Sequence, residues 1–119
     1  MMGMDNYRTP TEILNVSEEI KKSRFLTFLA PITGKEQMRE WLLTLRQQHS
    51  SARHHCWACV AGAPWDGQQY GFSDDGEPSG TAGKPLLNLL LGSGLGEVGV
   101  IVIRYYGGIK LGTGGLVRG

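Results

Sequence analysis

The polar loop at residues 74–85 gathers residue types that could do chemistry. It reads DDGEPSGTAGKP, with three carboxylates in four positions, and then two hydroxyl groups and a lysine. Carboxylates of this kind could hold Mg²⁺, with water in the remaining coordination positions, or pair with nearby Arg and Lys side chains. The simpler interpretation is a well-bonded turn, for which Asp, Gly and Pro are suited. The candidate ligand or metal residues are Asp74, Asp75, Glu77, Ser79, Thr81 and Lys84.

A second candidate is the glycine-rich segment at residues 104–118. Glycines before a helix would expose backbone N–H groups, and the aligned peptide dipoles there favour an anion. Three basic residues and no acid follow Glu97. The pattern is neither a Walker loop nor a dinucleotide fingerprint. The candidate anion-binding or nucleic-acid-binding residues are Arg104, Lys110, Gly112, Gly114, Gly115 and Arg118.

The segment HHCWAC at residues 54–59 has the Cys spacing of a redox or zinc motif. Because it has the character of a strand, side chains three apart point to opposite faces, so we expect Cys56 and Cys59 to be ordinary buried cysteines. His54 shares a face with Cys56 and is an accessory candidate. The alternative is a histidine satisfied by a local partner at the start of a strand.

Hydropathy patterns predict the elements that position these residues. The spacing of Met38, Trp41, Leu42 and Leu45, after a capping-box pattern from Thr33 to Glu36, predicts one buried helical face. A second helix opens at Lys84-Pro85, stops at Gly92, and has Ser79 or Thr81 as its expected cap. Strands are expected at 12–20, 23–32, 54–61, 68–72 and 98–106, and helices at 34–48 and 84–92.

The order of these elements predicts an α+β domain, with a mixed sheet and the helices packed on one face. The segment 98–106 is apolar at both odd and even positions, apart from Gly99 and Arg104. This is typical of a central strand that is covered on both faces.

Length and composition set the limits of the function. The chain has 119 residues, enough for one small domain, and residues 1–10 are expected to form a loose leader before a domain at 11–119. A net charge of +1 argues against a strong general attraction to DNA or to membranes. No apolar run is long enough to cross a membrane. With two cysteines and no secretory signal, the expected location is the cytoplasm.

The chain resembles the IMPACT family, specifically its bacterial members, over about residues 12–118. The resemblance is carried by EIKKSRF at 19–25, ARHHC at 52–56, the loop at 74–85 and RYYGGIKLGTGGLVR at 104–118. It implies the N-terminal domain of the family, whose fold is like the second domain of small-subunit ribosomal protein uS5, with a left-handed strand–helix–strand crossover. It also implies a link to translational control, and nucleic-acid binding has been suggested for bacterial members.

The resemblance implies further parts as well. Family members continue after the final Val-Arg with a full helix and a second domain, whereas Gly119 stands here in place of the next family residue. A domain without its last helix is expected to expose apolar surface, which would favour a homodimer.

Three hypotheses follow. The first is a non-enzymatic binding domain for RNA or a ribosome-associated protein, in which Lys110, Arg118 and the glycine amides meet phosphates. The second is a nucleotide-binding or phosphate-binding enzyme with a metal, such as Mg²⁺, at the acidic loop. The third is a protein-interaction module, in which the acidic loop and the basic tail neutralise each other. No catalytic residue is assigned and no cofactor is required.

Overall fold

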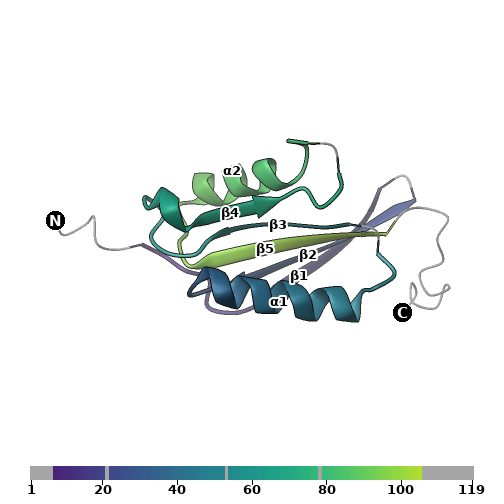
Figure 1. Cartoon of the computed structure of the whole chain (residues 1–119), viewed down its shortest axis with the longest axis horizontal. Coiled ribbons are helices and arrows are strands. Elements are labelled where there is room, and N and C mark those ends of the chain that lie inside the picture. The colour runs from purple at the N-terminus through teal and green to yellow at the C-terminus, as the bar shows by residue number, and fades with distance from the viewer. Residues whose placement is uncertain (1–6, 21, 53, 78, 106–119) are drawn as a thin grey trace.

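The described residues form a five-stranded sheet, and the last of these strands along the sequence lies at its centre (Figure 1). The computed structural model describes residues 7–20, 22–52, 54–77 and 79–105. The strand order is β1-β2-β5-β3-β4, and every neighbouring pair is antiparallel. The strands are β1 (Leu14–Ile20), β2 (Ser23–Pro31), β3 (His54–Val60), β4 (Tyr70–Ser73) and β5 (Val98–Tyr105).

The α+β class is confirmed, but the prediction of a mixed sheet was wrong. Strands β4 and β5 both run antiparallel to β3, so they are parallel to each other with β3 between them. The connection between them is therefore a crossover that carries a helix, and it never places two parallel strands side by side. The left-handedness of the crossover and the likeness to the ribosomal protein stay predictions.

The two long helices cover opposite faces of the sheet, not one face as expected. Helix α1 (Lys35–Gln48) and helix α2 (Gly83–Ser93) lie on either side of the sheet in Figure 1. Alternation along β5 explains this, because successive side chains point to opposite faces. Ile101 and Ile103 pack in the core under α1, whereas Val98 and Val100 pack in the core under α2. Strand β5 is therefore central and covered twice, as its sequence predicted.

Strand β3 divides its side chains in the same way. Cys59 belongs to the core under α1 and Ala58 to the core under α2. Cys56 is two residues from Ala58 and shares its face, so the two cysteines are buried on opposite faces and both are free thiols. This confirms that they are ordinary buried cysteines.

The helix ends differ in detail from the expectation. Gly34 precedes α1 without a side-chain cap, and the Thr33 N–H donates instead to Gln37 Oε1 at 2.7 Å, so Gln37 takes the place expected for Glu36. Helix α2 runs past Gly92 to Ser93, and the C-cap residue Gly94 has a φ of 76°, the left-handed conformation that ends many helices. Between β3 and β4, a short 3₁₀ helix, η2 (Gly67–Gln69), replaces the start of the expected strand.

Strand β1 lies at one edge and is exposed along its whole length. It carries the exposed apolar side chains Leu14, Val16 and Ile20. The homodimer stays a prediction. At the amino-terminal side, Arg8 forms an isolated bridge with Leu95, while residues 1–6 of the expected leader lie outside the described residues.

Candidate functional site at the loop between β4 and α2

The carboxylate of Asp74 organises the loop and caps α2, although it lies nine residues before the helix in the sequence. Asp74 Oδ1 accepts hydrogen bonds from the N–H groups of Ala82 at 3.0 Å and Gly83 at 2.6 Å, and Oδ2 accepts from Gly80 N–H at 2.8 Å. These backbone donors lower the pKa of the Asp74 carboxyl, Gly80 most of all. The prediction that Ser79 or Thr81 caps this helix was wrong. The N-cap residue is Ala82, and the Asp74 carboxylate accepts the hydrogen bonds of the first backbone N–H groups.

The second carboxylate, Asp75, ties the loop to β3 and α1. Its Oδ2 accepts a hydrogen bond from the backbone N–H of His55 at 2.6 Å, and its Oδ1 lies 3.3 Å from Arg46 Nη2. Its backbone carbonyl oxygen lies 2.6 Å from Nδ1 of His54. The accessory candidate His54 thus contacts the loop, as a histidine with a local partner would.

The third carboxylate, Glu77, pairs with Arg104, and both side chains line a cavity of about 270 Å³. Arg104 Nη1 lies 3.1 Å from Glu77 Oε1 and 3.0 Å from Oε2, and the guanidinium lies over the ring of Phe25. Only 11% of the Glu77 side chain is exposed. The pair therefore joins the acidic loop to the first residue of the basic segment. The other lining residues are Cys56, Thr81, Ala82, Pro85, Leu86 and Val102.

The three carboxylates thus face three different sets of partners. Within the part of the chain that the structure describes, no group of three His, Cys, Asp or Glu side chains is arranged to hold a metal ion. Burial, with the nearby carboxylates of Glu77 and Asp75, raises the pKa of the Cys56 thiol to about 12. Because the thiolate is the nucleophile, this thiol is unsuited to nucleophilic chemistry near neutral pH.

Of the remaining candidates, Thr81 lines the same cavity as Glu77, whereas Lys84 contacts β4. Ser79 and Thr81 are exposed, and Lys84 projects over the Phe72 ring on β4, with its Nζ 5.7 Å from the ring centroid. Five candidates of the basic segment lie outside the described residues: Lys110, Gly112, Gly114, Gly115 and Arg118.

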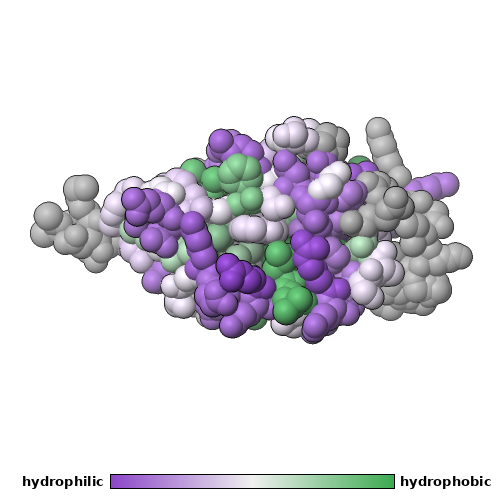
Figure 2. Space-filling view, in the orientation of Figure 1, coloured by the Kyte–Doolittle hydropathy of each residue, from purple (hydrophilic) through white to green (hydrophobic). Residues whose placement is uncertain are grey.

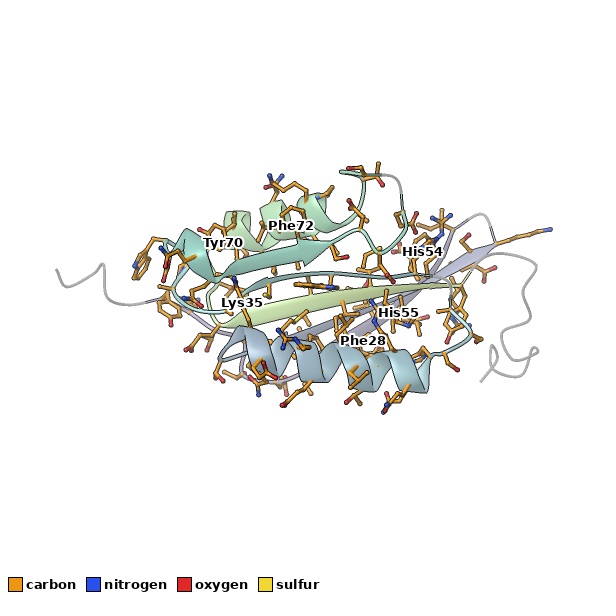
Figure 3. The ribbon with its side chains drawn as sticks, in the orientation of Figure 1. Phe28, Lys35, His54, His55, Tyr70 and Phe72 are labelled. Atoms are coloured by element: carbon orange, nitrogen blue, oxygen red, sulfur yellow. The ribbon has the colours of Figure 1, made fainter. Side chains whose placement is uncertain are left out.

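The partners of Asp75 were not predicted from the sequence. Arg46 lies on α1, and His55 is 20 residues before the carboxylate that its N–H contacts. Figure 3 shows His55 on the α1 side of the sheet and His54 toward the other side. No local spacing signals such pairs, because they form only when the loop folds back along β3.

Two histidines allow the pH dependence of the free energy of unfolding to be predicted. His49, directly after α1, is partly buried, and His55, on the α1 face of the sheet, is buried. Burial lowers the pKa of His49, whose Nδ1 lies 2.8 Å from the Tyr105 hydroxyl oxygen. Burial and Arg46 lower the pKa of His55, and Asp75 opposes this. Below about pH 6.5 the unfolded chain therefore binds more protons than the folded one, so the free energy of unfolding falls as the pH is lowered.

Urea denaturation at about pH 8 and about pH 5 measures this effect. We expect lower stability at the acidic value, and a smaller difference in the variant His49→Gln, which keeps a polar partner for Tyr105. Equal stability at both pH values would contradict the lowered pKa of these histidines.

The chain is similar to known proteins over most of its length. The model of the Impact N-terminal domain matches residues 21–119. The IMPACT family member YigZ of Escherichia coli is 58% identical over 115 residues, which is 97% of this chain and 56% of that protein. The chain thus spans about half the length of the curated relatives it matches.

Two solved structures share the fold. One is described as the crystal structure of a hypothetical protein, with a TM-score of 0.82 and 59% identity over 94% of this chain and 54% of that chain. The other is described as the two-domain translational regulator Yih1, with a TM-score of 0.54 and 24% identity over 87% of this chain and 41% of that one. The matched family model and the high identity over nearly the whole chain show that the protein belongs to the IMPACT family.

Proposed function

We propose that this domain is a non-enzymatic binding domain that acts in the regulation of translation, in the cytoplasm, through RNA or a ribosome-associated protein. The observation that carries the proposal is that the loop richest in ionisable groups holds the fold together. Asp74 is engaged by three backbone N–H groups, and Asp75 and Glu77 are paired with Arg46 and Arg104. Membership of a family that includes a described translational regulator supports the same conclusion.

An enzyme with a metal at this loop would need the three carboxylates to converge on one ion, whereas among the described residues each carboxylate faces a different set of partners. To converge, Asp74 would have to turn away from the first N–H groups of α2, and Glu77, whose side chain is 11% exposed, would have to leave Arg104. Each of these changes costs stability. A binding surface needs neither change.

The proposed contacts to RNA lie where the chain leaves β5. Arg104 is paired with Glu77 and therefore orients the end of β5, while Lys110 and Arg118 follow along the sequence with the glycine amides of Gly112, Gly114 and Gly115. A net charge of +1 implies few phosphate contacts, so binding should be modest and sensitive to salt.

Fluorescence anisotropy with mixed-sequence RNA oligonucleotides at low and high salt tests the proposal. We expect the double variant Lys110→Glu with Arg118→Glu to weaken binding at low salt, and to reduce the salt dependence by about two phosphate contacts. The matched control is Lys35→Glu with Arg39→Glu, which changes the net charge equally at exposed positions of α1 and should leave RNA binding nearly unchanged.

Undetectable RNA binding at low salt would contradict the RNA part of the proposal. So would equal losses in the two double variants, because the effect would then come from net charge rather than from the segment after β5.

A further inference from the structure

A groove of about 290 Å³ lies between α1 and β4, on the face of the sheet opposite α2. Its floor is apolar and includes the side chains of Met38, Leu42, Trp57 and Cys59. Sites for small molecules usually measure about 300–1,000 Å³ and enclose most of the ligand. This groove lies just below that range, so its size suits one or two side chains of a larger partner.

The groove is bordered by a strand with an open edge. Strand β4 lies at the edge of the sheet opposite β1, and no described strand pairs with its outer side. The β4 residue that faces the groove is Gly71, where an added Cβ would lie 3.1 Å from Trp57 and 3.3 Å from Cys59 Sγ. The missing side chain leaves the floor uncovered beside backbone groups that an added strand could use.

Positive charges stand on both sides of this edge. Lys35 and Arg39 line the groove one turn apart on α1, and Lys84 lies over Phe72 on the other face of β4. Arg39 pairs with Glu36, but both side chains are more than 70% exposed, so this pair contributes little. In Figure 3, Lys35 lies between β4 and α1, whereas Phe72 lies at β4 toward α2.

Figure 2 views the molecule from this side, and shows a hydrophobic patch in the region of α1 between hydrophilic ones. An apolar floor with a cationic rim is complementary to a large apolar side chain next to an acidic one. An extended segment places alternate side chains on opposite faces, so one would enter the groove and the next would meet Lys84 or Phe72.

We propose that the open edge of β4 and the groove beside α1 bind an extended, acidic peptide segment of a partner protein, with a large apolar side chain in the groove. The segment adds a strand next to the four residues of β4. The proposal rests on the proposed function, because it states which kind of protein segment the binding domain recognises.

Selection from a displayed library of random short peptides on the whole chain tests the proposal, followed by anisotropy with the selected, labelled peptides. We expect the enriched peptides to combine Asp or Glu with Leu, Phe or Trp. The variant Lys35→Glu with Arg39→Glu should weaken their binding by about tenfold. Hydrogen exchange of the backbone amides of Tyr70–Ser73 should slow when the peptide is bound, as pairing at the β4 edge requires.

The variant Lys110→Glu with Arg118→Glu carries the same charge change and should bind these peptides normally. A domain that binds the peptides but no RNA would keep this proposal and overturn the RNA part of the proposed function. Failure to enrich acidic peptides, equal affinity in the Lys35 and Arg39 variant, or unchanged exchange in β4 would overturn the peptide site.

Discussion

Replacing Gly83 with Ala is expected to lower the free energy of unfolding by about 2–3 kcal/mol. Gly83 is the first residue of α2 and is buried against β4. A Cβ there would lie 2.7 Å from the backbone carbon and oxygen of Ser73. The obstacle is backbone rather than a flexible side chain, so the helix must move away from the sheet. That movement would also disturb the hydrogen bond from Gly83 N–H to Asp74.

Gly92 is the matched control, because it lies in the same helix with nothing within 4 Å of an added Cβ. Alanine is the better helix former by about 1 kcal/mol, so Gly92→Ala should be neutral or stabilising. Urea denaturation of the two variants measures the difference. If Gly83→Ala were as stable as Gly92→Ala, the close approach of α2 to β4 would be refuted.

The second large effect is expected at the ion pair between Arg104 and Glu77. The variant Arg104→Met should lower the free energy of unfolding by about 2–3 kcal/mol, because it leaves the Glu77 carboxylate without its partner. The loss should be somewhat smaller than for a fully buried pair. The Glu77 side chain is 11% exposed and that of Arg104 is 28% exposed. The result would favour the hypothesis that the acidic loop and the basic segment are joined structurally.

The variant Arg39→Met removes an exposed pair with Glu36 and should cost no more than about 1 kcal/mol. The double variant Arg104→Met with Glu77→Gln should recover part of the loss in a double-mutant cycle. A purely additive cycle would show that the two side chains do not interact in solution.

The local elements could be predicted because their patterns are local. Helix α1 begins and ends within one residue of the expected positions, since its buried face repeats with the helical period. The pattern of β5 itself indicates that the two helices lie on opposite faces of the sheet, not on one face as predicted. A strand that is apolar on both faces needs a cover on each, which places α1 and α2 on opposite sides of the sheet.

The loop could be predicted only in part. Its composition indicated a turn with many hydrogen bonds, which is what Asp74 forms within the loop. The partners of Asp75 could not be predicted, because Arg46 and His55 come from other elements and are brought together by the fold. The anion-binding function assigned to residues 110–118 stays a prediction.

The central place of β5 has a consequence for how the protein is made. Residues 14–31 can form one hairpin and residues 54–73 another, but both pair with β5, which is synthesised after them. Until about residue 105 has been synthesised, the edges of β2 and β3 that pair with β5 have no strand partner. The two core clusters also lack the apolar side chains of β5 until then. The sheet should therefore form only after β5 has been synthesised, because its central pairings are contacts between distant parts of the sequence.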